Sequence, residues 1–541
     1  MPRSKHDEQG DARSAPYGWR PSRRTALTRA GQVLLAGSAG SLSTLLTACG
    51  TDGAPAPRAT AVRAGGVLSA GVASDPDTLD PQKSSLAIAA EVYGGVFDRL
   101  LDLRPDGRFV PSLATSWSSP DERTHIFDIR PDVVFHNGDP LTAGDIAFTF
   151  ERITSEAFGA TYAADFSAVS GVEVTGPHQV TFHLNRPFAP LLANLANRGH
   201  ILSRRAVRSK DPSRHPVGTG PFAFRTWKQG EGISLERNRG YFAARRPYLD
   251  AVDFSYLAVD ESRILALRAG RLDWVDGVPP QSVREVRSDD ALTYVSGSVA
   301  GKPQFLFFNT TRPPLDNKAL RQAICWAIDR REIAKVGFFG AVEAGSQEFG
   351  RDSFWYSDDT DPYAGAPDPA RVRAKLAEAG LPDGGVSIGF AAWTSAPDAT
   401  RTAQLIRQQL KPFGIHIEIE TLDLSVWVNR LFTKDYQMTL AFQEQIIDPD
   451  NFWSLIWTST ASQNVTGYRN TTVDALVAKA AASTDRDARK EIYGQIRRTV
   501  LDDAPTLFTV YTPLCYATKG SILGARISPT QDPGLVNVGF G

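Results

Sequence analysis

The chain of 541 residues is 42% hydrophobic and 22% charged, proportions that are ordinary for a globular protein. Its formal net charge is −1 and no basic block interrupts the body of the chain, which argues against nucleic acid as a partner. At about 100–200 residues per domain, the part that follows the N-terminal region is long enough for two or three domains. No window in that part is apolar over the roughly 20 residues that a membrane span needs.

The N-terminal segment shows a basic stretch, a weakly apolar run and a lone cysteine, in that order. The sequence SRRTAL, with Arg23 and Arg24, resembles the twin-arginine export motif, and LTAC, which ends in Cys49, resembles the lipobox of bacterial lipoproteins. These resemblances imply that residues 1–48 are a signal peptide and that Cys49 is lipidated. Residues 49–65 are rich in Pro, Ala and Gly and predict a flexible tether. We therefore expect an extracytoplasmic body, anchored as a lipoprotein to the outer face of the cell membrane.

A hairpin followed by a helix is predicted over residues 125–153. The alternating start of this segment predicts a strand, and Asn137-Gly138 favours a tight turn because both residues tolerate positive φ. Thr142 is the expected N-cap of the helix that follows. The pattern of a second hairpin recurs over residues 174–184, so hairpins cluster in the first part of a mixed α/β chain.

The middle of the chain begins with a predicted strand over residues 304–310, QFLFFNT. A long helix is predicted after it, because apolar residues recur there at helical spacing. Asp316 or Asn317 can cap this helix and Gly337 closes it, which places Cys325 inside.

The last third of the chain alternates helix and strand again. In GIHIEIE, residues 414–420, three isoleucines share one face, which is the period of a half-buried strand, and a helical pattern precedes it. A further helix is predicted over roughly residues 473–502, with a break near Thr484-Asp485. The apolar sequence TLFTVY then predicts another strand. Helix, short loop and strand in succession indicate α/β units.

A search for catalytic motifs finds none. The sequence contains no phosphate-binding loop, zinc-protease motif or serine-hydrolase motif. Asp448 and Asp450 could serve a glycoside hydrolase, but two neighbouring carboxylates give no evidence of the required separation. Cys325 and Cys515 belong to no CxxC pair; two buried free thiols are expected, and a disulfide stays open. We therefore expect a binding function, with no catalytic residue, no cofactor and no metal site.

Six stretches, in order along the chain, resemble the extracytoplasmic solute-binding proteins of ABC importers, specifically the peptide/nickel class called family 5. They are SDPDTLDPQ, PSLATSWSSPDERTHIFDIRPDVVFHNGDPLTAGDIAFTFERI, VGTGPF, DNKALRQAICWAIDRREI, DPDNFW and YRNTTVDALVAKAAASTDRDARKEIYGQI. The resemblance runs from about residue 66 to the C-terminus. It implies an α/β fold of two lobes, the periplasmic-binding-protein type II or Venus-flytrap fold, with an extra subdomain on lobe I. It also implies a permease pair and an ATPase pair as partners; in Gram-positive bacteria such receptors are lipoproteins.

The resemblance also divides the chain into lobes. The expected boundaries are lobe I over 66–303, with the extra subdomain over about 100–205, lobe II over 304–507, and a return to lobe I over 508–541. The two strands that cross between the lobes would then fall near QFLFFNT and TLFTVY. The solute would sit in the cleft between the lobes, and closure around it would be a hinge motion.

The resemblance suggests where a peptide would be held. Peptide-binding members place an aspartate three residues before an acidic-Pro pair, where it holds the ligand's ammonium. Here the pair is Asp448-Pro449 and the matching residue is the neutral Gln445. Glu444 could substitute if the strand shifts by one residue, although such a slip turns its side chain to the other face. The arginine with which dipeptide-binding members hold the ligand's carboxylate is matched by Trp393. Both departures argue against tight recognition of zwitterionic dipeptides.

Aromatic and hydroxyl side chains complete the candidate ligand-binding set. Trp393, Trp427 and Trp453 could stack on a flat face of the solute. Ser84 and Ser85 are further candidates. We expect a monomer that binds a peptide-like solute, with longer peptides favoured over dipeptides. An oligosaccharide and chelated nickel stay open as solutes, and an exported hydrolase or a signalling or adhesion lipoprotein stays open as another class.

Overall fold

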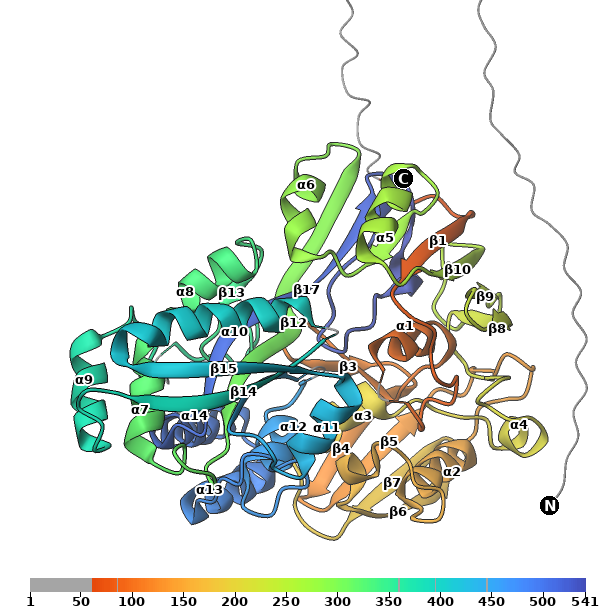
Figure 1. Ribbon diagram of the computed structural model, residues 1–541. Coiled ribbons are helices and arrows are strands. Elements are labelled where there is room, and N and C mark those ends of the chain that lie inside the picture. Colours follow the sequence, from red (N-terminus) through yellow and green to blue (C-terminus); the bar gives the residue numbers. More distant parts are fainter. Residues whose placement is uncertain (1–60, 85, 359–360, 395, 444–445) are drawn as a thin grey trace, which may run out of the picture. The chain divides into compact units, whose positions relative to one another are not determined.

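The computed structural model describes residues 61–541 except residues 85, 359–360, 395 and 444–445. Helices and strands alternate along this part of the chain, so the predicted α/β class is confirmed (Figure 1). None of the helices in the described ranges is both long and apolar enough to cross a bilayer.

One large sheet of eleven strands forms the framework of the described body. In spatial order its strands are β15 (Ile415–Leu422), β14 (Val386–Trp393), β16 (Met438–Phe442), β12 (Leu292–Phe308), β17 (Thr506–Lys519), β11 (Trp274–Asp276), β1 (Val67–Val72), β10 (Ala251–Tyr256), β9 (Gly232–Arg237) and β8 (Phe222–Lys228), with β13 (Glu343–Ala344) paired to β17. The sheet therefore has β15 and β8 at its two edges.

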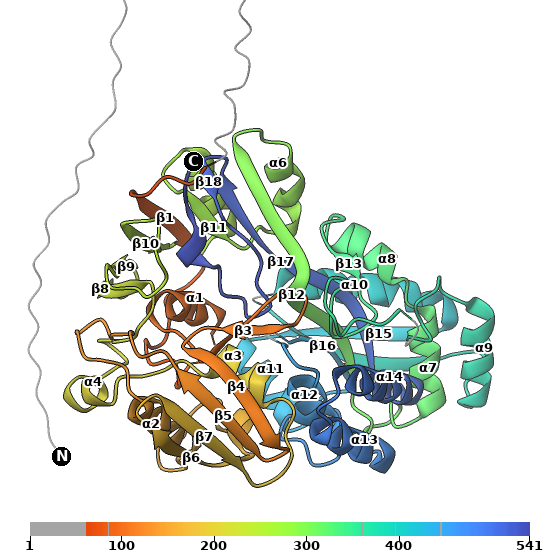
Figure 2. The same cartoon turned by 180° about the vertical axis from the view of Figure 1, so that it is seen from behind.

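The two long strands β12 and β17 pair antiparallel in the middle of this sheet (Figure 2). We call the side that contains β11, β1, β10, β9 and β8 lobe I, and the side that contains β16, β14 and β15 lobe II. The register of β12 against β17 shifts between Gly297 and Gly301. A Cβ atom on Gly301 would lie 2.3 Å from the carbonyl oxygen of Thr512, so a glycine is needed where these strands approach closely.

A second, four-stranded sheet forms a subdomain with a core of its own. Its order is β4 (Ala114–Asp121), β5 (Thr124–Ile129), β7 (Gln179–Leu184) and β6 (Val169–Gly176). The helix α2 (Ala143–Thr154) packs on it through Phe150, whose ring centre lies 4.9 Å from that of Phe182. The helix α3 (Leu191–Arg198) contributes Leu191 and Leu195 to the same buried cluster.

The remaining elements cover the two lobes. Those on the side of lobe I are α1 (Ala87–Val96), β2 (Leu101–Leu103), β3 (Phe109–Pro111), η1 (Ala163–Phe166), α4 (Arg204–Ser209), α5 (Asp260–Arg268), η2 (Pro280–Ser282), α6 (Val283–Arg287), β18 (Ile522–Leu523), η6 (Leu535–Asn537) and β19 (Gly539–Phe540). Those on the side of lobe II are α7 (Lys318–Ala327), α8 (Arg330–Glu332), η3 (Ile333–Gly337), α9 (Pro369–Glu378), α10 (Pro397–Leu410), η4 (Lys411–Phe413), α11 (Leu424–Phe432), α12 (Asp450–Phe452), η5 (Trp453–Trp457), α13 (Thr471–Ala482) and α14 (Arg486–Asp503).

Several local predictions are confirmed because the residues that specify them act over short distances. Thr142 precedes α2, and its backbone N–H donates to the Asp145 carboxylate at 3.0 Å, which closes a capping box. The hairpin predicted over residues 174–184 is β6–β7, and residues 415–420 of GIHIEIE lie in β15. The hairpin expected at the start of 125–153 is wrong in its pairing, because β5 pairs with β4 and β7, and the turn at Asn137-Gly138 is closed by an isolated bridge between Val134 and Pro140. The break near Thr484 is real, since Asp485 caps α14 with its side chain.

The long helix predicted between residue 316 and Gly337 is interrupted at Ile328 and Asp329, and its second half is formed by α8 and η3, which end at Gly337 as predicted. Asn317 caps α7 as expected, but Ile328 adopts an extended conformation with ψ of 119° and ends the helix. Asp329 then accepts hydrogen bonds from the next turn, so it caps a new short helix. The buried Arg330 donates to the carbonyl of Gly345 at 2.7 Å, a tertiary contact that helical spacing alone does not reveal.

The two cysteines of the described body are free and buried, as predicted. Cys325 belongs to the core of lobe II, and Cys515 lies on β17 in a cluster of lobe I. Burial raises the pKa of both thiols, so both stay protonated and unreactive at neutral pH.

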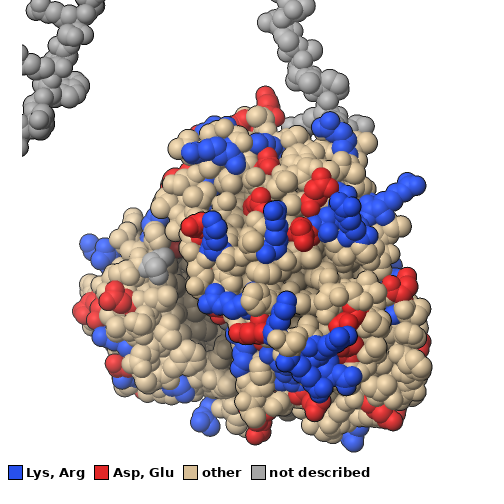
Figure 3. Space-filling model, turned by 90° about the vertical axis from the view of Figure 1, so that its right-hand side faces the viewer, with Lys and Arg blue, Asp and Glu red and all other residues tan. Residues whose placement is uncertain are grey.

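On the surface, positive and negative side chains are interspersed over the face seen in Figure 3.

Candidate functional site

A cavity of about 510 Å³ lies between lobe I and lobe II. Lobe I contributes residues near β2 and β3, the turn of the β4–β5 hairpin and the start of α3. Lobe II contributes residues 349–355, the segment before α12 and the start of α14. The volume falls within the roughly 300–1,000 Å³ that ligand pockets occupy. Because both lobes line the cavity, movement of one lobe against the other would open or close it.

The walls of this cavity are largely apolar. Phe109 and Val299 line it from lobe I, and Phe349, Phe354 and Trp355 line it from lobe II. Apolar walls with a few polar groups are the usual composition of a site for a small organic molecule. The cavity therefore suits a solute with a substantial apolar surface.

A buried ion pair forms part of the lobe II wall. Arg489 donates two hydrogen bonds to the Asp448 carboxylate, at 2.8 and 2.6 Å, and both side chains are at least 96% buried. Arg489 also donates to the carbonyl of Ala480 at 3.1 Å, which ties α14 to the end of α13. Asp448, a candidate from the sequence, thus lines the cavity. Its negative charge is already balanced by Arg489.

Three more charged side chains line the cavity. Arg486, from lobe II, lies over the ring of Phe354 at 3.7 Å and donates one long hydrogen bond, 3.4 Å, to the carbonyl of Asp106. Asp121 and Glu122 come from the β4–β5 turn of lobe I and are exposed. The cavity therefore has negative charges on its lobe I wall and an additional positive charge on its lobe II wall.

His125 supplies a neutral polar group to the same cavity. Its Nδ1 lies 2.7 Å from the hydroxyl of Ser119, and its Nε2 is buried without a hydrogen-bond partner. Burial lowers the pKa of this imidazole, so it is uncharged at neutral pH. A buried nitrogen without a partner costs free energy unless a ligand or water satisfies it.

In the described ranges, no group of three or more His, Cys, Asp or Glu side chains is placed to hold a metal ion.

Two of the candidate tryptophans meet in a different place. The ring centres of Trp393 and Trp427 are 4.4 Å apart, and both side chains are buried in lobe II. Trp427 donates through Nε1 to the hydroxyl of Thr439 at 2.8 Å. Together with Phe442 they line a smaller cavity of about 180 Å³, whose lining shares no residue with the larger one. The apolar side chains at its exposed rim are Leu424, Phe432 and Phe442.

The other candidates lie elsewhere. Trp453 is in the core of lobe II, where its Nε1 donates to Glu348 at 2.8 Å. Ser84 is buried in lobe I, and its hydroxyl accepts from the N–H of Leu86 at 3.1 Å. Neither residue lines the cavity between the lobes. The candidates that lie outside the described residues are Ser85, Glu444, Gln445, Arg23, Arg24 and Cys49.

Most of the residues that line the cavity between the lobes were not predicted from the sequence. Arg486, His125, Phe354 and Trp355 come from segments that are far apart in the chain and carry no motif. For Arg486 one signal was present, because the predicted helix break at Asp485 places it at the start of a helix. For the other three residues no local pattern distinguishes a wall of a cavity from an ordinary core position.

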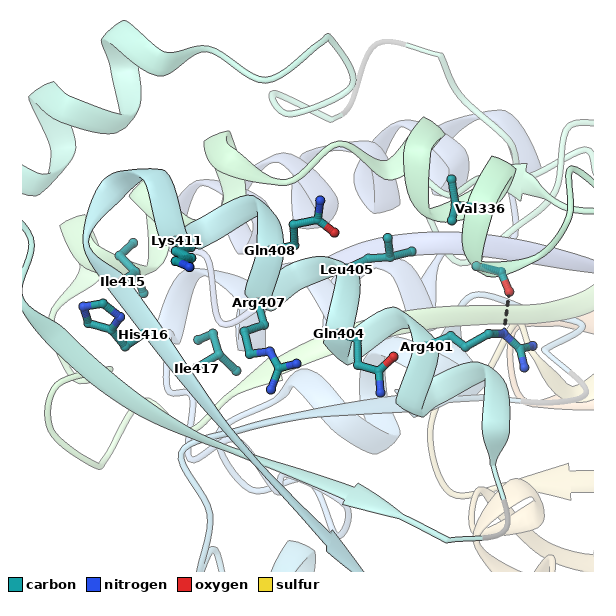
Figure 4. Close-up of a pocket in the computed structure, with 11 residues that line it drawn as sticks. Val336, Arg401, Gln404, Leu405, Arg407, Gln408, Lys411, Ile415, His416 and Ile417 are labelled. Carbon is teal, nitrogen blue, oxygen red and sulfur yellow. Dashed lines mark hydrogen bonds between the residues drawn. The ribbon is translucent and has the colours of Figure 1, made fainter.

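A larger hollow of about 770 Å³ lies on lobe II alone (Figure 4). It is formed by α10, the short helix η3 and the start of β15, and Arg407 and Lys411 line it. Arg401, also in its lining, donates through Nε to the carbonyl of Gly337 at 2.9 Å. Because lobe I contributes nothing to this hollow, hinge closure would not enclose a solute there.

The family of the chain is shown by comparison with known proteins. The family model described as "Bacterial extracellular solute-binding proteins, family 5 Middle" matches residues 108–464, which is well over half of the chain. The protein therefore belongs to family 5 of the bacterial extracellular solute-binding proteins. Proteins of this family bind solutes for transport and share a two-lobed fold, so the fold expected from the sequence is confirmed.

Individual relatives are similar over almost their whole length. The glutathione-binding protein GsiB of Pectobacterium atrosepticum is 25% identical over 470 residues, covering 84% of this chain and 90% of that protein. The peptide transport periplasmic protein SapA of Salmonella typhimurium is 27% identical over 542 residues, covering 94% of this chain and 96% of that protein. The structure of the ABC transporter-associated periplasmic binding protein DppA of Helicobacter pylori, solved in complex with the peptide STSA, matches with a TM-score of 0.75 and 25% identity. The match covers 88% of this chain and 98% of that one.

Proposed function

We propose that this protein captures a peptide-like solute, most suitably an oligopeptide, in the cavity between its lobes and delivers it to the permease pair of an ABC importer. The observation that carries the proposal is the 510 Å³ cavity lined by both lobes. Similarity to a peptide transport protein and to a binding protein solved with a peptide supports a peptide-like solute. An ATPase pair would drive transport once the loaded protein has docked.

Delivery would depend on movement of the lobes about the paired strands β12 and β17. We propose lobe boundaries at 66–303, 304–507 and 508–541, with the subdomain within about 100–205; the passage of both long strands from one lobe to the other supports them. A solute shifts the balance between open and closed forms only through contacts that it makes more strongly in the closed form. Side chains from both lobes face the cavity, so a bound solute would supply such contacts.

A longer peptide fits the charges of the cavity better than a free dipeptide does. Asp448 cannot serve as an unpaired acid for an ammonium, because Arg489 already balances it. Trp393, which stands where dipeptide binders have an arginine, is stacked on Trp427 in lobe II. Apolar walls and few free charges favour a solute that is held through its backbone and its apolar side chains.

We further propose that the protein is a monomeric lipoprotein on the outer face of the cell membrane. The support is the sequence: Arg23 and Arg24 in an export signal over residues 1–48, and Cys49 in a lipobox. The segment 49–65 would then tether the body. A flexible chain of that length has a typical end-to-end distance of about 20–25 Å, which keeps the body close to the permease.

The proposal is tested by titrating the purified protein with peptides of two to six residues, oligosaccharides and nickel–histidine, and by following its melting temperature and its scattering profile. A peptide at 100 times its Kd should add about 2.7 kcal/mol of stability. Phe354→Ala should weaken peptide binding by roughly 10- to 100-fold, since a buried aromatic contact is worth about 1.5–3 kcal/mol. The matched control is Phe339→Ala, whose side chain is exposed and outside the cavity. Stabilisation by the nickel complex or a sugar alone, or steady product formation, would refute peptide capture.

A further inference from the structure

Arg486 is an arginine in the cavity that no carboxylate of the described residues balances. We propose that it binds a carboxylate of the solute, so that the cavity selects molecules in which a carboxylate adjoins an apolar group. This inference rests on the proposed function, because it assigns one ligand group within the same cavity.

The neighbours of Arg486 hold it in place without neutralising it. It is the first residue of α14, and the carboxylate of the preceding Asp485 accepts hydrogen bonds from the N–H groups of Asp487 and Ala488. The guanidinium lies across the ring of Phe354, 3.7 Å from its centre. Stacking on an aromatic face fixes the plane of a guanidinium and leaves its edge free for a bidentate partner.

The hydrogen bonds of Arg486 leave donors unused. Within the described ranges it donates to the carbonyl of Asp106 at 3.4 Å, which is long for an N–H···O bond. Burial lowers the pKa of this guanidinium by more than the nearby carboxylates of Asp487 and Asp106 raise it. The cation has therefore lost water without gaining a close anion, and a carboxylate on the solute would supply one.

Arg489, one helical turn further along α14, provides an internal comparison. Its two bonds to Asp448, at 2.8 and 2.6 Å, show the geometry that a paired arginine adopts in this wall. Arg489 therefore stabilises the fold and offers no net charge to a solute. Of these two arginines that line the cavity, Arg486 is the one available for recognition.

The surroundings of Arg486 restrict the anion to one that is attached to an apolar group. Phe354 and Trp355 adjoin it, and Ile446 and Ile447 line the same cavity. On the other wall, Asp121 and Glu122 would repel a phosphate dianion and would tolerate a solute with a distant ammonium. The best match is a peptide that ends in an apolar residue with a free carboxyl terminus, for example one ending in Phe, Leu or Tyr.

The test begins with capture of peptides by the purified full-length protein. One sample is a chymotryptic digest of casein, in which most peptides end in Phe, Tyr or Leu, and the other is a tryptic digest, in which they end in Lys or Arg. Captured peptides are identified by mass spectrometry. The most strongly retained peptide is then synthesised as the free acid and as the C-terminal amide, and both are titrated calorimetrically. We expect retention of chymotryptic peptides and a preference for the acid of about 10- to 100-fold, the range for a charge-assisted contact.

Arg486→Gln should reduce the preference for the acid to less than about twofold, because it weakens binding of the acid far more than binding of the amide, and Arg486→Lys should restore the preference in part. The matched control is Arg498→Gln, an exposed arginine on the same helix and outside the cavity. Circular dichroism and melting temperature identify a variant that fails to fold. Capture of peptides whose acid and amide bind equally well would overturn the role of Arg486 and leave peptide capture standing. Capture of no peptide from either digest would overturn the proposed function itself.

Discussion

Replacing Asp450 with asparagine is expected to remove a marked pH dependence from the stability of the folded protein. The Asp450 side chain is 6% exposed, and its Oδ1 has no hydrogen-bond partner among the described residues. Its Oδ2 accepts from the hydroxyl of Ser454 at 3.2 Å. Burial raises the pKa of Asp450 to about 7, and the nearby Asp448 carboxylate adds to the rise, while Arg489 opposes it.

The size of the effect follows from the difference between the folded and unfolded pKa values. An ordinary aspartate has a pKa of 3.8, so the folded state holds this proton about three units more tightly. Each unit corresponds to about 1.4 kcal/mol, which gives about 4 kcal/mol in total. Since the folded state binds the proton better, this contribution is complete below about pH 4, falls as the pH rises to about 7, and is lost above that.

The measurement is the free energy of unfolding of the wild type and of Asp450→Asn between pH 4 and pH 8. For a body of roughly 480 residues the unfolding entropy is about 1 kcal/mol/K, so 4 kcal/mol is also a relative shift of about 4 °C in melting temperature. Asparagine keeps the size of the side chain and can still bond to Ser454. We expect the free energy of unfolding of Asp450→Asn, relative to that of the wild type, to increase as the pH rises. A difference between the two proteins that stays constant across this range would refute the assignment of a raised pKa to Asp450.

Three further predictions concern other residues. Asp448→Asn should destabilise the protein by about 3–5 kcal/mol in urea unfolding, because it leaves the buried Arg489 without its counter-ion; a loss below 1 kcal/mol would mean that the pair is not intact in solution. Trp393→Ala should cost about 3–5 kcal/mol of stability, since it empties the space against Trp427, and unchanged unfolding would show that this stack does not form. Cys49→Ser should move the protein from the membrane fraction to the soluble fraction, and continued sedimentation with membranes would contradict lipid anchoring.

Much of the secondary structure could be predicted from the sequence because its determinants are local. Asp485 accepts from N–H groups two and three residues away, the N–H of Thr142 donates to Asp145 three residues on, and the alternation in GIHIEIE is visible within a single strand. The helix that was expected to continue past Ile328 shows the limit of such reasoning. The helix stops at the extended Ile328 and a new one starts at Asp329, where the buried Arg330 donates to the carbonyl of Gly345 in another segment.

The sequence by itself determined the class of fold and the family, since ordered motifs over most of the chain carry both. The tertiary structure alone decided which side chains form the cavity, because its walls come from segments of both lobes that are distant in sequence. The two arginines at the start of α14 illustrate the reason. Arg486 and Arg489 are chemically identical and one turn apart, and nothing local separates them. Long-range packing brings Asp448 to Arg489 and leaves Arg486 on the face of Phe354, so one arginine stabilises the fold and the other is free to bind.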